Sequence, residues 1–166
     1  MQEIYIENIG KILKNKKILE RELDVKITNK GRDFFINGES EKEFIALKVL
    51  EALELGFSIN YALKLKNEEN LFQTINIKDI TKRRDLETIK GRIIGTKGKT
   101  LKTLTNLTDC NLCLKDNCLG IIGNYENIQD AIIALESLIH GSKQGNVYSR
   151  LEKQKKSKRI NKRLNK

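Results

Sequence analysis

The sequence is poor in residues on which many functional sites depend. It has one histidine, His140, so no metal or catalytic site with two histidines can be built. Tryptophan and proline are absent and aromatic residues make up 5% of the chain, which argues against a nucleic-acid surface of stacked rings. There is no apolar run of about 18 residues and no basic region followed by an apolar stretch at the N-terminus. We therefore expect a cytoplasmic, intracellular protein, nucleolar if eukaryotic.

Positive charge is in excess. The 166 residues carry a net charge of +10, which favours an anionic partner such as nucleic acid, an anionic membrane surface or an acidic protein. Residues 153–166 include no acidic residue and these basic ones: Lys153, Lys155, Lys156, Lys158, Arg159, Lys162, Arg163 and Lys166. This basic tail attracts polyanions whether it is a frayed chain or a helix.

The chain contains an internal repeat. An offset of 85 residues, which lays Gly10 on Gly95, aligns the two halves without a gap. Identical or apolar residues then coincide at many positions, among them Ile4/Ile89, Leu19/Leu104, Asp24/Asp109, Val25/Cys110, Gly38/Gly123, Leu50/Leu135 and Gly56/Gly141. We infer two copies of one unit at 1–66 and 80–148, joined by a linker at 67–79 and followed by a basic C-terminal tail or helix at 149–166.

Each copy is predicted to have the order β-α-α-β-β-α. The first strand is expected at 3–6 or 87–90, and a very short helix then leads into a tight turn at Gly10 or Gly95. The later elements are a helix at 14–23 or 99–108, strands at 25–28 and 34–36 or 110–114 and 119–122, and a helix at 41–55 or 126–140. The fold class is therefore α+β, with a three-stranded antiparallel sheet and three covering helices in each copy.

The segment around Gly95, Thr96, Lys97 and Gly98 is the candidate binding site. Two glycines three residues apart let the backbone turn tightly between helices and leave room for an approaching phosphate chain. Free N–H groups at the start of the next helix favour anions. The surrounding side chains suit about four nucleotides of single-stranded RNA, with basic residues at Arg92, Lys97, Lys99 and Lys102 and an apolar floor of Ile94, Leu101 and Leu112.

The same loop also resembles the end of a nucleoside-triphosphate-binding loop. A nucleoside-triphosphate loop would also end in Gly98-Lys99-Thr100, but it requires a glycine at position 93, which is Ile93.

The first copy keeps Gly10 but has Leu13 where the second has Gly98. We therefore predict that the first copy binds RNA weakly or not at all through this loop and serves as a structural or protein-docking unit.

Cys110, Cys113 and Cys118 have a spacing that suggests a zinc site, but the sequence offers no fourth ligand for it. Because Cys110 aligns with Val25 at a core strand position, we interpret them as free thiols and expect no metal or other cofactor. Tyr148 is expected to pack. No carboxylate pair, activated serine or activated cysteine is recognisable, so an enzyme is not expected.

These residues resemble the type I KH family. The segment Lys90-Gly91-Arg92-Ile93-Ile94-Gly95-Thr96-Lys97-Gly98-Lys99 is similar to the core of the archaeal and eukaryotic tandem-KH factors of small-ribosomal-subunit assembly. These factors are the KH partners of the endonuclease that trims the 3′ end of small-subunit rRNA. A second signature of that family is resembled by Gly141-Ser142-Lys143-Gln144-Gly145-Asn146-Val147-Tyr148-Ser149-Arg150-Leu151-Glu152, and a third by Gly56-Phe57-Ser58 followed by Ala62-Leu63. The short length is similar to that of the archaeal form.

The resemblance implies a non-enzymatic protein that binds the single-stranded 3′ region of small-subunit rRNA during late processing. It also implies contact with the processing endonuclease and, in archaea, with the α subunit of the translation initiation factor that carries initiator tRNA. Two alternatives stay open. One is a KH-type regulator of mRNA or translation with no ribosome-assembly role, and the other is a protein-interaction adaptor that works through the first copy.

Overall fold

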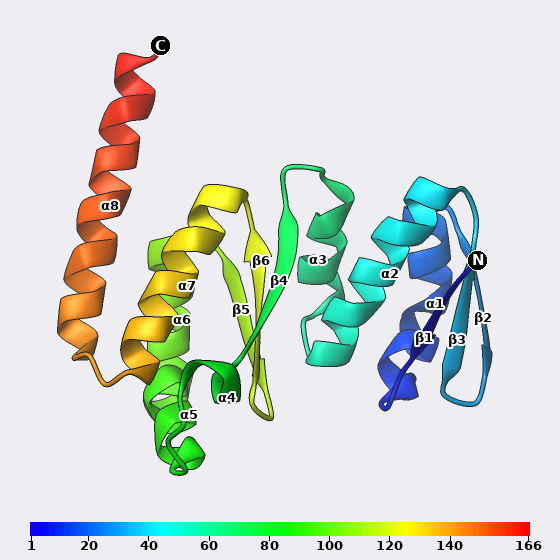
Figure 1. Cartoon of the computed structure of the whole chain (residues 1–166). Helices are drawn as coiled ribbons and strands as arrows, with labels where there is room; N and C mark the ends of the chain where they lie inside the picture. The colour runs from blue at the N-terminus through cyan, green and yellow to red at the C-terminus, as the bar shows by residue number, and fades with distance from the viewer. The chain divides into compact units, whose positions relative to one another are not determined.

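The computed structural model describes all 166 residues, which divide into two compact units, Met1–Phe72 and Gln73–Lys166 (Figure 1). Each unit contains one three-stranded sheet with helices packed on it. None of the helices combines the length and the apolar character needed to span a membrane.

The first unit is built on strands β1 (Gln2–Tyr5), β2 (Lys26–Lys30) and β3 (Asp33–Asn37). They form an antiparallel sheet in the order β1-β3-β2. Helices α1 (Ile9–Leu23) and α2 (Ser40–Leu55) pack on this sheet and on each other, and the short helices α3 (Ile59–Ala62) and η1 (Leu63–Lys66) follow. The core lies between sheet and helices.

The predicted turn at Gly10 is wrong. Gly10 lies in the first turn of α1, which runs without interruption from Ile9 to Leu23, so the first unit has the order β-α-β-β-α before its short helices. Leu13 is a good helix former, and the left-handed conformation that a glycine adopts readily is costly for it. Ile12 and Leu19 are buried on one face of the helix, so a continuous helix is more stable here than a turn.

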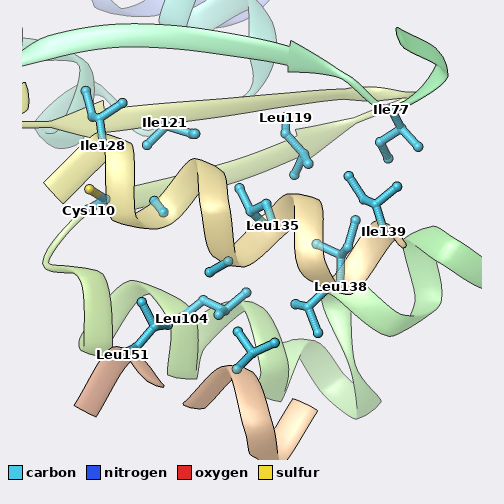
Figure 2. Close-up of a cluster of buried hydrophobic side chains, with 14 of the residues drawn as sticks. Ile77, Leu104, Cys110, Leu119, Ile121, Ile128, Leu135, Leu138, Ile139 and Leu151 are labelled. Atoms are coloured by element: carbon cyan, nitrogen blue, oxygen red, sulfur yellow. The ribbon is translucent and has the colours of Figure 1, made fainter. Parts of the chain in front are cut away.

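The second unit has strands β4 (Leu71–Asn76), β5 (Asn111–Lys115) and β6 (Cys118–Gly123) in the order β4-β6-β5. Its helices are α4 (Ile77–Ile80), α5 (Leu86–Ile94), η2 (Thr96–Gly98), α6 (Lys99–Thr108), α7 (Tyr125–Ile139) and α8 (Gln144–Leu164). Figure 2 shows α7 in the middle of the core, with Leu135 between Leu119 of the sheet and Leu104 of α6. Leu151 brings α8 into the same cluster.

The first strand of the second unit lies earlier than predicted. The expected strand at 87–90 is part of α5, and the expected linker at 67–79 holds β4 and α4. Leu86, Ile89 and Ile93 recur at the spacing of one helix face, and Ile89 and Ile93 are fully buried. The repeat therefore breaks before the two-glycine loop: Ile4 is in a strand and Ile89 in a helix.

From the centre of α1 and α6 onward, the 85-residue offset is confirmed by the structure. The buried residues coincide at Leu19/Leu104, Val25/Cys110, Ile36/Ile121, Ala46/Ala131, Leu50/Leu135 and Leu53/Leu138. Asp24 and Asp109 end their helices with nearly the same left-handed φ, 52° and 55°. The predicted tail is a continuous helix, since α8 begins at Gln144 and runs to Leu164.

Candidate nucleic-acid interface

The two-glycine loop joins α5 to α6 in a conformation of its own. Helix α5 ends at Ile94 and α6 begins at Lys99. Between them Gly95, Lys97 and Gly98 have positive φ angles of 75°, 54° and 75°. A left-handed lysine is uncommon and is a form of backbone strain that concentrates at functional sites. The loop therefore turns the chain sharply. The backbone N–H groups of Gly98 and Lys99 donate to the carbonyl oxygens of Gly95 and Thr96, so the expected free N–H groups are used within the turn.

The two glycines of the loop are required for different reasons. A Cβ on residue 95 would lie 2.2 Å from Oγ1 of Thr100 and 2.7 Å from its backbone nitrogen, so a side chain there collides with the start of α6. A Cβ on residue 98 would meet no atom within 4 Å, so Gly98 faces open space. Its positive φ, rather than crowding, favours glycine. The space beside Gly98 is therefore open to an approaching backbone.

The predicted lysines surround the loop with unpaired positive charge. Lys97, Lys99 and Lys102 are exposed and form no ion pair. No acidic residue occurs in the sequence between Glu87 and Asp109. Thr96 is exposed beside them. The loop and the first turns of α6 thus present ammonium groups to the same anion, which suits the phosphate chain of a nucleic acid.

Arg92 supports the loop from behind. Its Nη1 and Nη2 donate to the carbonyl oxygens of Leu138 and Ser142 at 3.0 and 2.5 Å, so the guanidinium ties α5 to the end of α7. Nε2 of Gln144 donates to the carbonyl oxygen of Arg92 and to Oγ1 of Thr100, both at 3.1 Å. The charge of Arg92 remains near the site, but the hydrogen bonds of its two terminal nitrogens are made within the protein.

Sequence reasoning did not identify Gln144 and Thr100 as supports of the site. Thr100 is 4% exposed, and its hydroxyl joins the start of α6 to the start of α8. One signal pointed there: Gln144 lies in the segment 141–152, which was singled out by family resemblance. Three other residues of that segment pack: Val147 and Leu151 are buried, and Tyr148 lies against the core, which confirms the prediction for Tyr148.

The apolar floor is only partly open. Ile94 is 38% exposed, whereas Leu101 and Leu112 are half-buried and pack against the core of the second unit. Strand β5, which carries Leu112, is the edge strand of its sheet and packs beside α6. All five of its residues are half-buried. Helix α6 thus contacts both the loop and this edge strand, and Ile94 is the most exposed of the three apolar residues.

The cysteines belong to the sheet of the same unit. Cys110 is buried and its thiol is free, and burial raises the pKa of that thiol to about 11. Cys113 and Cys118 are half-buried on β5 and β6. The sulfur of Cys110 also packs closely against Gly123, because a Cβ on residue 123 would lie 2.6 Å from it. Its position is that of a small core residue, like Val25 in the first unit.

Comparison with known proteins identifies the family to which this chain belongs. A model of the eukaryotic type KH-domain (KH-domain type I) matches residues 71–156, from the start of β4 into α8. A KH domain-containing protein of Methanocaldococcus jannaschii is 32% identical over 154 residues, which cover 89% of this chain and 68% of that protein.

Two further relatives carry more specific names. The pre-rRNA-processing protein pno1 of Schizosaccharomyces pombe is 38% identical over 105 residues, which cover 61% of this chain and 44% of the relative. A solved structure of the a/eIF2alpha-aDim2p-rRNA complex from Pyrococcus horikoshii contains a chain that is 29% identical, with a TM-score of 0.86 and 94% of both chains covered. The chain thus spans less than half of the fission-yeast relative.

Proposed function

Because the chain belongs to the eukaryotic type KH-domain family (KH type I), we propose that it is an RNA-binding protein that holds single-stranded RNA on its second unit. The observation that carries this proposal is the loop from Gly95 to Gly98. Its left-handed backbone, open surface and three unpaired lysines form an anion-binding turn at the start of α6. In this proposal Thr96, Lys97, Lys99 and Lys102 contact phosphates. The bases lie on Ile94, Leu101 and Leu112, and Arg92 supports the loop.

The RNA in our proposal is the 3′ region of small-subunit rRNA, bound during ribosome assembly. Two findings support it: one relative is named a pre-rRNA-processing protein, and another was solved in a complex with rRNA. The resemblance of residues 90–99 and 141–152 to small-subunit assembly factors points to the same RNA. In this role the protein positions an RNA strand and performs no catalysis.

We further propose that the first unit is a degenerate KH copy. Its sheet order and buried positions repeat those of the second unit, but α1 replaces the helix-loop-helix that binds RNA. This unit therefore provides structure or a protein-docking surface. The proposed protein partners are the initiation factor α subunit, which is present in the complex of the Pyrococcus relative, and the rRNA 3′-end endonuclease, which the family resemblance implies.

The test of this proposal is binding to a short RNA that matches the 3′ end of the organism's own small-subunit rRNA, with a scrambled RNA beside it. Replacing Thr96 and Lys97 together by Asp should weaken binding by about tenfold or more at moderate salt. The control makes the same two substitutions at Thr28 and Lys30, which are exposed on β2 of the first unit. It should change affinity by about threefold at most.

Two outcomes would separate the parts of the proposal. If the loop variant and the control bind alike, the loop is not the RNA site. If the native and scrambled RNAs bind equally well, the protein binds RNA but the assignment to the rRNA 3′ region is wrong. Co-sedimentation with precursor small-subunit particles, absent for a general mRNA regulator, then decides the cellular role.

A further inference from the structure

The C-terminal half of α8 is held to the second unit by lysines rather than by apolar packing. After Leu151 no residue of this helix is buried. Nζ of Lys155 instead donates to the carbonyl oxygen of Asn106 at 2.7 Å and pairs with Asp109 at 3.2 Å. Nζ of Lys158 donates to Oδ1 of Asn127 and pairs with Asp130. These contacts fix the helix beside the end of α6 and the start of α7, where Figure 1 shows α8 running on beyond α7.

A hollow of about 580 Å³ lies between α8 and these two helices. Its lining is polar, and the members that matter here are Asn124, Asn127, Arg159, Asn161, Lys162 and Asn165. This volume is in the range of pockets that take ligands of nucleotide size.

The hollow offers hydrogen-bond donors in excess. Oδ1 of Asn124 accepts the backbone N–H of Asn127, and Oδ1 of Asn127 accepts from Lys158. Each of these oxygens therefore already accepts one hydrogen bond, while the Nδ2 group of each asparagine keeps its two donors for a ligand. Arg159 and Lys162 are exposed, make no ion pair and can only donate. The matching ligand is rich in acceptors and negatively charged.

The charge of the lining agrees with this conclusion. Lys155 and Lys158 are neutralised by their aspartate partners, and the remaining carboxylate in the lining is Glu126. Arg159 and Lys162 outnumber it, and the rest of the helix beyond Lys153 adds basic residues without an acidic one. Phosphate oxygens and ribose hydroxyls of an RNA strand supply what amide and guanidinium donors need.

We infer that this hollow, between α8 and the adjoining ends of α6 and α7, is a second RNA-backbone site that takes the phosphates and sugars of the strand held at the Gly95–Gly98 loop. The inference rests on the proposed function. Helix α6 connects the two sites, because the loop precedes its first residue and Asp109, which lines the hollow, follows its last. Ten helical residues rise about 15 Å, so the hollow is reached only by an RNA longer than the roughly four nucleotides that the loop holds.

The experiment compares two charge-reversal variants of the full chain on two fluorescent probes, oligouridine of about four and about twelve nucleotides. R159E/K162E alters the hollow. K156E/R163E is the matched control, because it also reverses one lysine and one arginine, both exposed on α8 and outside the hollow. At about 0.1 M salt, R159E/K162E should weaken 12-mer binding by about tenfold and leave 4-mer binding within about twofold. The control should stay within about threefold on both.

Equal losses of 12-mer affinity in both variants would overturn the inference and show a diffuse attraction by the tail. No loss in either variant would overturn it as well, and a loss of protein-partner binding alone would assign the surface to a protein. The loop variant T96D/K97D separates this inference from the proposed function: loss of 4-mer binding there supports the loop. A wild-type chain that binds neither oligouridine probe would overturn this inference, whereas the proposed function is decided separately by the RNA that matches the rRNA 3′ end.

Discussion

Gly95 and Thr100 are packed so closely that residue 95 has no room for a side chain. The Oγ1 atom of Thr100 lies 2.2 Å from where a Cβ on residue 95 would stand, and Gly95 has a φ of +75°. The same hydroxyl accepts a hydrogen bond from Gln144. The turn that exposes the start of α6 is therefore fixed by contacts inside the unit and does not wait for RNA to form it.

Gly95→Ala should lower the free energy of unfolding by roughly 2–3 kcal/mol, because it adds a strained φ and a collision with Thr100. Gly91→Ala is the control: Gly91 lies inside α5, is exposed and has no atom within 4 Å of an added Cβ. That change should stabilise by roughly 0.5–1 kcal/mol. Urea unfolding measures both, and a fully stable Gly95→Ala variant would show that the loop is not fixed in this way.

Gln144→Ala removes the side chain that links Arg92 and Thr100. We expect a loss of roughly 1–2 kcal/mol in unfolding free energy, since two hydrogen bonds disappear, together with weaker RNA binding from a looser loop. Gln154→Ala, also half-buried on α8 but without such bonds, should leave both quantities nearly unchanged. Equal effects of the two substitutions in thermal unfolding and RNA titration would argue against Gln144 as a support.

The repeat provides a matched test of the lysines, because Lys99 and Lys102 align with Lys14 and Lys17 of α1. Changing the first pair to alanine should reduce the magnitude of the slope of log affinity against log salt by about 1.4, as two phosphate contacts are lost. Changing the second pair should have little effect on that slope, because no loop precedes it. A similar slope change for both pairs would mean that RNA is attracted by charge anywhere on the chain.

The helices, strands and core of both units after α1 and α6 could be predicted from the sequence, because buried residues recur at the same positions in both copies. Leu19/Leu104 and Ile36/Ile121 are examples. The start of the second unit could not be predicted from a gapless alignment, which paired Ile4 with Ile89 across segments of different structure. Strand β4 gave little signal because most of its side chains are exposed.

For the site, the loop and its lysines were recognisable as local sequence, and the structure adds the contacts that join distant segments. The role of Arg92 is an example: its partners Leu138 and Ser142 lie 46 and 50 residues away. No local pattern reports such a contact. The spacing of Leu86, Ile89 and Ile93 was a helix signal that could have corrected the predicted strand at 87–90.

Leu13→Gly restores the second glycine of the motif in the first unit and should not create a binding loop. Leu13 is on the exposed side of a continuous helix, so glycine there should cost roughly 1 kcal/mol of stability relative to Leu13→Ala. RNA affinity should stay unchanged in both variants. An additional RNA site in Leu13→Gly, seen as a changed stoichiometry by calorimetry, would contradict the interpretation of α1 as uninterrupted.

Cys110 should make the free energy of unfolding depend on pH in the alkaline range. Its pKa is about 11 in the folded chain, against an ordinary value of 9.0, so the buried thiol keeps its proton while an unfolded chain would release it. Stability should therefore be complete below pH 9 and fall as pH rises from 9 to 11. Cys110→Val, which copies Val25 of the first unit, should remove this part of the decline. Parallel pH curves for the two proteins would show that Cys110 does not contribute.

The most direct measurement is an NMR titration of the full chain with an RNA of about four nucleotides, following the backbone amide signals. If RNA is held at the start of α6, the signals of Gly95–Lys99 should shift, while those at the aligned positions Gly10–Lys14 should stay in place. Shifts at Gly10–Lys14, or shifts that avoid Gly95–Lys99 altogether, would contradict RNA binding by the loop of the second unit.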